Sequence, residues 1–415
     1  MAERPAIKCL HLADLHLGWE PADLGGKEAE RARERDGLLR KAVDFALDPA
    51  NKIGLVVIAG DLFDSHHPTA KQVEETIAQL RRLETAGIPS VTTPGNHDEI
   101  SYVDSVYRLH GDRWPGYLVS DPMPVRVTTV NVDGMAVHVY SLAYIGGVTH
   151  TRPPIREFPR SAAPGVHLAV FHGSLGWDGG DRSLPLEAEA LGSAGYDYVA
   201  LGHFHRFSSE ESGHSTLVYA GPVEGRGFSD PGTGQFVVAE ISPAAGDGGN
   251  AGQSAVKVRR IPVPGVRRYV TIDLDVTALP DAEALDHAMA EALDGAGAGD
   301  RAGGAAEAGN SGGAAVLSPL VRVELRGTAP FGINLEALAA RHQDRCYYLE
   351  VRGEASVLAP AEIDQWATEP TLRGEFIRRV RRKEEEALAS GDAVGATVAR
   401  RALVQGLIAL RGGAR

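Results

Sequence analysis

The sequence has 415 residues, 43% of them hydrophobic and 23% charged, which suits a globular protein of about two or three domains. Its two cysteines, Cys9 and Cys346, exclude a disulfide framework and a cysteine-rich zinc module, and they fit a reducing compartment. The formal net charge of -13 argues against binding nucleic acid by bulk charge, so such contact needs a local basic patch or metal ions. No apolar run approaches the roughly 20 residues that span a bilayer, and the N-terminal residues lack an apolar signal region. We therefore expect a cytoplasmic protein without membrane contact.

In the first half of the chain, apolar strand-like runs repeatedly end in polar clusters. These runs cover residues 7–13, 54–59, 88–93, 166–171 and 196–201. Helical patterns at 27–47 and 69–86 separate the early runs. Alternating strands and helices predict an α/β core, in which ligands bind beyond the carboxyl ends of the strands. Because every polar cluster falls at such an end, we expect the polar side chains to meet in one site.

The pattern becomes mostly β after Gly221. Two strands are expected at 235–241 and 255–262, joined by a loop rich in Gly, Ala and Asn. The segment Pro264-Gly265 then marks a boundary. A first domain is therefore predicted over residues 1–264.

A small α+β domain is predicted over residues 265–359. It combines a helical pattern near 281–293 with three strand-like runs, at 268–276, 320–325 and 347–351. Residues 295–315 are almost all Gly and Ala, so we expect a flexible insertion there.

Residues 360–415 read as helices with a break near Ser390-Gly391. Apolar residues recur at three- and four-residue steps, which predicts amphipathic helices that pack on the small domain or dock on a partner. A basic run could contact DNA or form a solvated face; it comprises Arg373, Arg378, Arg379, Arg381, Arg382 and Lys383, opposed by Glu375.

The polar clusters supply a set of candidate metal ligands. They are Asp14, His16, Asp61, Asn96, His172, His203 and His205. Carboxylate, imidazole and amide groups suit manganese, iron or zinc. Asp61 could bridge two ions, as two-metal hydrolytic sites with a separation of about 3.5–4 Å require.

His97 follows Asn96 directly and would reach the same site without being a ligand. A protonated imidazole there could serve the leaving oxygen or the charge of the transition state. Asp64 is the expected partner that orients this ring, with capping of the helix after Pro68-Thr69 as the alternative. Substrate contact and an ordinary loop position stay open for His66, His67 and Arg226.

The motifs Asp-x-His, Gly-Asp-x-x-Asp, Gly-Asn-His-Asp, His-Gly and Gly-His-x-His, in this order, resemble those of the calcineurin-like metallophosphoesterases. The resemblance covers about residues 7–225. It implies an α/β (α+β) four-layer sandwich, with two central mixed β-sheets flanked by helices. It also implies one metal ion held by Asp14, His16, Asp61 and His205. A second ion would be held by Asp61, Asn96, His172 and His203, with His97 catalytic.

Within this family the sequence is similar to bacterial DNA-repair exonucleases of the SbcD and YhaO type. The similarity lies in residues 11–18, 59–64 and 221–227, and Ser65-His66 stands where the phosphoprotein phosphatase branch carries Arg-Gly. The resemblance implies two divalent ions, with Mn²⁺ expected and Fe or Zn as alternatives. It further implies a capping domain, a C-terminal helical segment that docks on an SMC-like ATPase subunit, and a homodimer.

We therefore expect a metal-dependent phosphodiesterase that acts on DNA, as an exonuclease or end-processing nuclease. One alternative is a small-molecule metallophosphoesterase for a cyclic nucleotide or phosphomonoester, with its active-site mouth closed by short loops. Another is a partner-binding regulatory subunit whose metal site is vestigial.

Overall fold

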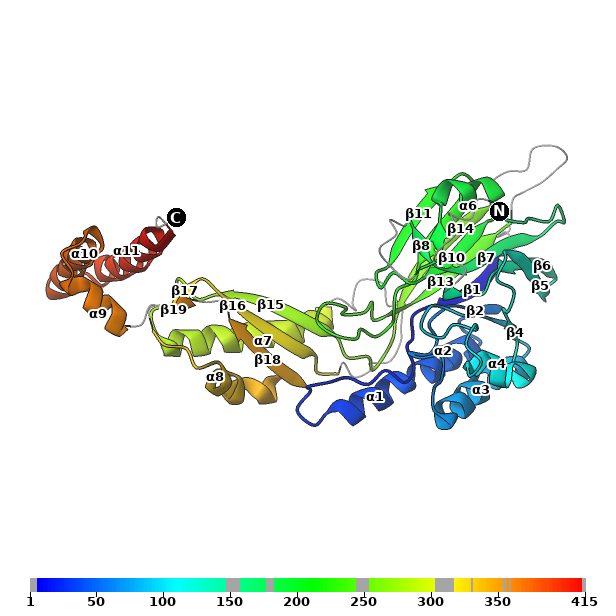
Figure 1. Ribbon diagram of the computed structural model, residues 1–415, viewed down its shortest axis with the longest axis horizontal. Helices are drawn as coiled ribbons and strands as arrows, with labels where there is room; N and C mark the ends of the chain where they lie inside the picture. The colour runs from blue at the N-terminus through cyan, green and yellow to red at the C-terminus, as the bar shows by residue number, and fades with distance from the viewer. Residues whose placement is uncertain are drawn as a thin grey trace. The chain divides into compact units, whose positions relative to one another are not determined.

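A computed structural model describes residues 6–146, 157–176, 183–243, 254–302, 317–329, 331–353, 356–357 and 360–412 (Figure 1). The chain divides into two compact units, Met1–Val266 and Arg267–Arg415. The further division of the second unit at residue 360 stays a prediction. No helix within the described ranges is both long and apolar enough to cross a membrane.

The first sheet of the first unit has six strands in the order β14-β13-β1-β2-β3-β4. Its parallel half comprises β1 (Ile7–Leu12), β2 (Leu55–Ala59), β3 (Ser90–Thr93) and β4 (Tyr117–Leu118). On the other side of β1, two antiparallel strands complete the sheet, β13 (Gln235–Ser242) and β14 (Ala255–Pro262). The sheet is therefore mixed, and β1 lies in its interior.

The second sheet also has six strands, in the order β11-β12-β10-β7-β6-β5. The four inner strands run parallel: β6 (Met135–Ser141), β7 (Val166–His172), β10 (Tyr198–Gly202) and β12 (Ser215–Tyr219). The edge strands pair antiparallel with their neighbours, β5 (Val125–Val132) with β6 and β11 (Ser208–Ser212) with β12. A short separate pair joins β8 (Ser174–Leu175) to β9 (Pro185–Leu186).

The helices of the first unit follow the sequence patterns with one interruption. The pattern at 27–47 forms two helices, α1 (Glu28–Asp36) and α2 (Leu38–Leu47), with Gly37 between them. Helix α3 (Ala70–Thr85) begins with a capping box in which Thr69 and Gln72 each bind the other's backbone. Thr69, rather than Asp64, therefore caps this helix. The other helices within the described residues of this unit are α4 (Val106–His110), a 3-10 turn (Gly111–Arg113) and α6 (Ala188–Ala194).

Three hydrophobic cores separate four layers. Side chains of β2 alternate between two of them: Val56 and Ile58 pack with Leu39 and Leu80 from α2 and α3, whereas Val57 faces the second sheet. A third core lies between the second sheet and α6, and it includes Phe171, Leu191 and Leu201. A strand that is buried on both faces reads as a continuous apolar run, which explains the pattern in the sequence. The predicted α/β fold with two mixed sheets flanked by helices is confirmed.

The second unit contains a three-stranded parallel sheet in the order β15-β16-β18. Its strands are β15 (Tyr269–Asp275), β16 (Leu320–Arg326) and β18 (Tyr348–Gly353). It further contains α7 (Ala282–Ala302), α8 (Leu335–His342), a 3-10 turn (Gln343–Arg345) and the short pair β17 (Thr328–Ala329) and β19 (Ser356–Val357). Leu285, Met289, Val323 and Leu338 share the core between the sheet and these helices.

Helix α7 corrects one expectation. Gly295 was predicted to open a flexible insertion, but α7 continues through Ala302. Alanine has the highest helix propensity, so the alanines between the glycines allow a helix that has already formed to extend. The rest of the predicted insertion, residues 303–315, lies outside the described residues.

The C-terminal helices are α9 (Pro360–Thr368), α10 (Leu372–Ala389) and α11 (Ala393–Gly412). The break predicted near Ser390-Gly391 is present between α10 and α11. Ile377 from α10 and Leu403 and Leu407 from α11 share a core of their own with Ile363 from α9. The apolar faces of these helices therefore pack mainly on one another.

Candidate metal centre

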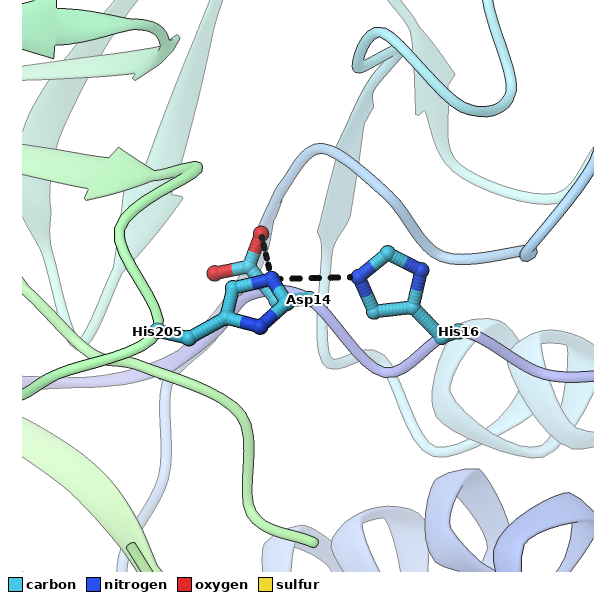
Figure 2. A group of neighbouring side chains, drawn as sticks. All are labelled: Asp14, His16 and His205. Carbon is cyan, nitrogen blue, oxygen red and sulfur yellow. Dashed lines mark hydrogen bonds and ion pairs between the residues drawn. The ribbon is translucent and has the colours of Figure 1, made fainter. Parts of the chain in front are cut away.

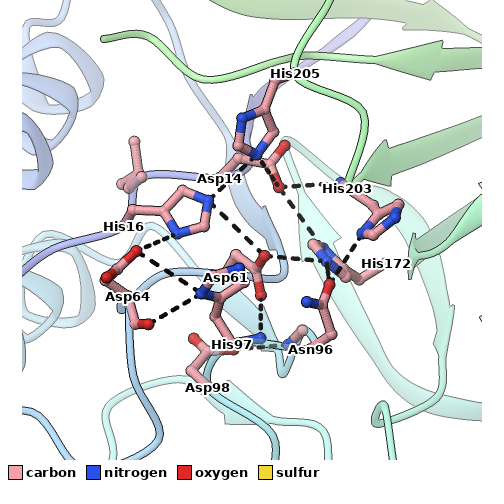
Figure 3. Close-up of polar contacts among 12 residues, drawn as sticks. Asp14, His16, Asp61, Asp64, Asn96, His97, Asp98, His172, His203 and His205 are labelled. Atoms are coloured by element: carbon pink, nitrogen blue, oxygen red, sulfur yellow. Dashed lines mark hydrogen bonds and ion pairs between the residues drawn. The ribbon is translucent and has the colours of Figure 1, made fainter. Parts of the chain in front are cut away.

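The polar clusters after β1, β2, β3, β7 and β10 meet at the carboxyl ends of these strands, where the two sheets face each other (Figure 3). All the candidate ligands expected from the sequence contribute to this centre: Asp14, His16, Asp61, Asn96, His172, His203 and His205. Their convergence explains why each strand-like run in the sequence is followed by a polar residue.

One group of donors comprises Asp14, His16 and His205 (Figure 2). The Nε2 atoms of His16 and His205 lie 3.3 Å apart, and His205 Nε2 is 4.0 Å from Asp14 Oδ1. Two imidazole nitrogens at this separation, with a carboxylate beside them, form a set that one divalent ion could hold. His16 and Asp14 are both fully buried.

A second group of donors surrounds His172. Its Nε2 lies 3.3 Å from Asp61 Oδ2 and 2.9 Å from Asn96 Oδ1, and the latter oxygen is also 2.9 Å from His203 Nδ1. Asp61 Oδ2 lies 3.8 Å from His16 Nε2 as well. Asp61 Oδ2 therefore lies near histidines of both groups, as a bridging carboxylate would, and Asp14 Oδ1 is likewise 3.9 Å from His172 Nδ1.

His97 lies at the open edge of the centre, with a side chain that is 35% exposed. Its backbone N–H donates to Asp61 Oδ1 at 2.9 Å, and its ring Nδ1 lies 3.0 Å from the carbonyl oxygen of Asp64. Since a carbonyl oxygen only accepts, Nδ1 carries the proton. The Asp64 carboxylate is 3.7 Å from His97 Nδ1 but only 3.1 Å from His16 Nδ1. The backbone carbonyl of Asp64 therefore makes the main contact with the His97 ring, whereas the carboxylate of Asp64 lies closer to the His16 ring.

The loops that carry the ligands have strained backbones. Asp14, His16 and Asp61 have φ values of 53°, 46° and 49°, and His203 has φ of 103°. Each non-glycine residue in this region costs on the order of 1–3 kcal/mol, and such residues concentrate at functional sites. A Cβ at Gly95 would clash with Asp61, so only glycine fits before Asn96.

The electrostatics of the centre favour a bound cation. Burial raises the pKa of Asp14 to about 6, against the opposing effects of His172 and His205. Burial alone would lower the pKa of His172, but Asp61 and Asp14 outweigh it and raise this pKa to about 9. Asp14 Oδ2 is buried without a hydrogen-bond partner among the described residues. Buried carboxylates with an unused oxygen need positive charge, so the donor set fits divalent metal ions.

One neighbour of the centre was not found from the sequence. Asp230, in the loop between β12 and β13, lies 2.8 Å from His205 Nδ1 and holds that nitrogen protonated, which leaves Nε2 to face Asp14. Arg226 Nε donates to Asp230 Oδ2 at 3.3 Å, and Arg226 Nη1 is 3.6 Å from Asp64 Oδ1. Asp230 follows no motif, and its only sequence signal is its place in a Gly-rich loop close to Arg226.

Other acidic and histidine residues of the motifs have structural contacts. Asp98 accepts hydrogen bonds from the backbone N–H groups of Gly95 and Phe63, at 2.7 and 3.1 Å, and from the Tyr107 hydroxyl at 2.7 Å. It therefore fixes the loop that carries Asn96 and His97. His66 lies apart from the metal centre and stacks on Tyr102, with ring centroids 4.1 Å apart.

Residues 7–207 match the sequence model of the family described as calcineurin-like phosphoesterase. The chain contains a calcineurin-like phosphoesterase domain. The uncharacterized metallophosphoesterase YhaO of Bacillus subtilis is 26% identical over 252 residues. The aligned region covers 56% of this chain and 57% of that protein. The DNA double-strand break repair protein Mre11 of Methanopyrus kandleri is 27% identical over 232 residues, 52% of this chain and 49% of that protein. The crystal structure of TT1561 of Thermus thermophilus aligns with 56% of this chain and 94% of that chain, at 14% identity and a TM-score of 0.34.

These matches confirm the resemblance inferred from the ordered motifs. The phosphoesterase domain is related to YhaO and Mre11, and its class is that of metal-dependent phosphoester hydrolases, which use divalent metals. The chain spans about half the length of these curated relatives. The match to the family model ends at residue 207, before the second unit of the chain begins at Arg267.

Proposed function

We propose that the protein is a metal-dependent phosphodiesterase that hydrolyses DNA, as an exonuclease or end-processing nuclease. The observation that carries this proposal is the complete donor set around Asp61 with His97 exposed at its edge. The Mre11 relatives are named DNA double-strand break repair proteins, which supports DNA as the substrate.

The proposed ligands divide as the motifs imply. Asp14, His16, Asp61 and His205 would hold one ion, and Asp61, Asn96, His172 and His203 the other. The ions, when bound, would polarise the phosphoryl group and neutralise the charge that develops on it. Manganese is the proposed metal, with iron or zinc as alternatives for a mixed nitrogen and oxygen donor set.

The residue proposed to act on the substrate is His97. Nδ1 of the ring donates to the carbonyl oxygen of Asp64, and Nε2 has no hydrogen-bond partner among the residues that the structure describes. In the imidazolium form, Nε2 would donate a proton to the departing sugar oxygen or stabilise charge on the phosphate. His97 is partly exposed, so it can reach a substrate that the buried ligands cannot touch.

The proposed setting of this activity is cytoplasmic. An SMC-like ATPase is the proposed partner of the C-terminal helices, and a homodimer is the proposed assembly.

The test is manganese-dependent cleavage of end-labelled linear single- and double-stranded DNA, with bis-p-nitrophenyl phosphate as a second substrate. Shortening of the DNA by the native protein, and its loss in His97→Ala, would support the proposal and reveal the polarity. Hydrolysis of the small diester alone would point to a small-molecule phosphoesterase. Failure to hydrolyse either substrate, with metal bound and an ATPase partner added, would identify a regulatory subunit.

A further inference from the structure

A cavity of about 430 Å³ adjoins the metal centre on the side of His205. Its lining also includes Phe204, Arg206, Ser208, Arg226 and Ser229. Sites for small organic groups have volumes of about 300–1,000 Å³ and combine apolar surface with a few polar groups. The cavity is therefore large enough for one nucleotide beside the centre.

Phe204 offers an aromatic surface in this cavity. It stands between the proposed ligands His203 and His205, and it is 40% exposed. Its ring is supported by Tyr219, with centroids 5.0 Å apart, and by His203 at 5.6 Å. A large aromatic side chain that is held in place and still open to solvent suits stacking with a base.

Two arginines supply positive charge to the same cavity. Arg226 is held by Asp230 and Asp64, at 3.3 and 3.6 Å, and its side chain remains 28% exposed. Arg206 is exposed, and no carboxylate lies within ion-pair distance of it among the residues the structure describes. In a chain with a net charge of -13, two guanidinium groups on one cavity beside a phosphoesterase centre favour a phosphate ligand.

Arg226 could in principle serve only to neutralise Asp64 and Asp230. Neutralisation of carboxylates does not explain why Arg206 lines the same cavity. It also does not explain the exposed ring of Phe204 there. An aromatic surface together with guanidinium groups matches a nucleotide, which presents a flat base and a phosphate on one unit.

We infer that this cavity holds the nucleotide next to the scissile phosphate. Its base would stack on Phe204, and the phosphate on its other side, away from the scissile bond, would lie at Arg206 and Arg226. The inference rests on the proposed hydrolysis of DNA and adds how the substrate is recognised. It also distinguishes DNA from small diesters, because bis-p-nitrophenyl phosphate has neither a base nor a second phosphate.

The experiment combines variants with altered substrates. The native protein is given a single-stranded oligonucleotide and the same oligonucleotide with an abasic residue at either position flanking the cleaved bond. We expect the abasic residue at one of these positions to raise KM roughly tenfold, since stacking of one base on an aromatic ring contributes on that scale. Phe204→Leu should raise KM for the intact oligonucleotide to a similar extent and suffer no further loss on the abasic one. Phe204→Trp should restore the difference between the two substrates.

The arginine is tested through salt dependence. Removing one phosphate contact lowers the slope of log affinity against log salt by about one. We expect Arg206→Gln to show this change with the oligonucleotide. Arg259→Gln is the matched control, because Arg259 is exposed on β14, pairs with Glu240 at 3.2 Å and does not line the cavity. It should leave KM and the salt slope unchanged.

Several results would overturn the inference while the proposed function stands. One is an abasic residue that raises KM equally in Phe204→Leu and in the native protein. Another is a slope of log affinity against log salt that is unchanged in Arg206→Gln. A third is a loss of bound manganese in Phe204→Leu. The last result would assign Phe204 to the support of His203 and His205. If the native protein leaves DNA intact and hydrolyses only the small diester, the proposed function and the inference both fail.

Discussion

At the residue scale, the centre separates side chains that can hold a cation from one that can act on a substrate. His205 is confined by Asp14, His16 and Asp230, whereas His97 is partly exposed and is held through its backbone N–H and its Nδ1 atom. We predict that His97→Ala retains its metal and loses hydrolysis by roughly 100- to 10,000-fold. His205→Ala should instead lose bound metal. Elemental analysis and rate measurements on both variants test this, and equal metal loss in the two would refute the division of roles.

Asp230 is predicted to act on the metal through His205. Replacing it with Asn weakens the hydrogen bond that fixes the protonated nitrogen of His205, and the loss of such a partner typically lowers metal affinity by about 10- to 100-fold. Competition with a chelator measures this affinity. Asp44→Asn, at an exposed ion pair with Arg82, is the control and should bind metal like the native protein. Equal affinity in Asp230→Asn would exclude the role.

His11 is predicted to make stability depend on pH. Burial lowers its pKa from 6.5 to about 3, so the unfolded chain takes up a proton at pH values where the folded protein does not. Its contribution is fully present above pH 6.5 and is lost as the pH falls towards 3. We expect the free energy of unfolding to fall more steeply between about pH 6 and 4 in the native protein than in His11→Gln, by up to about 1.4 kcal/mol per pH unit. Urea unfolding of both proteins with a chelator present measures this, and parallel curves would contradict it.

At the scale of elements, close contacts between the loops that follow the strands fix the positions of the candidate ligand side chains. The loop after β3 passes so close to Asp61 that a Cβ at Gly95 has no room. We predict that Gly95→Ala displaces Asp61, lowers metal content and lowers the melting temperature in the presence of manganese. Gly134→Ala is the control for backbone effects of alanine, since Gly134 has positive φ but nothing lies near its Cβ position. A similar loss of metal in both variants would show a general effect of alanine.

The basic run of the C-terminal helices shows how an element changes the meaning of a sequence pattern. Glu375 pairs with Arg378 and Arg379 at 2.8 and 2.9 Å, and Arg381 pairs with Asp364 at 2.6 Å. Most of the positive charge of this segment therefore has a carboxylate partner within the helices. Exposed pairs of this kind contribute about 0–1 kcal/mol each, so they favour a solvated face over a DNA contact.

At the scale of the whole molecule, the sequence predicts what depends on local pattern. Asp14, Asp61 and Asn96 were expected in one site because each follows a buried strand, and the structure brings them together. Asp230 could not be predicted, because it reaches His205 from a loop with no recurring pattern. The place of β13 beside β1 also depends on a pairing between distant segments, which hydrophobic periodicity does not encode. Helix α7 continues past Gly295 although a Gly-rich composition predicts flexibility, because a helix that has already formed extends at little cost.

The interior place of β1 in its sheet has a consequence for biosynthesis. Strand β1 pairs on one side with β2 and on the other with β13, which is made much later than β1. His203 and His205, which complete the donor set, also emerge late relative to Asp14. A nascent chain that has not passed β13 therefore has an open flank on its first sheet and cannot present the finished centre. The capacity of the domain to bind metal at this centre can therefore arise only after the loop that follows β10 has been translated.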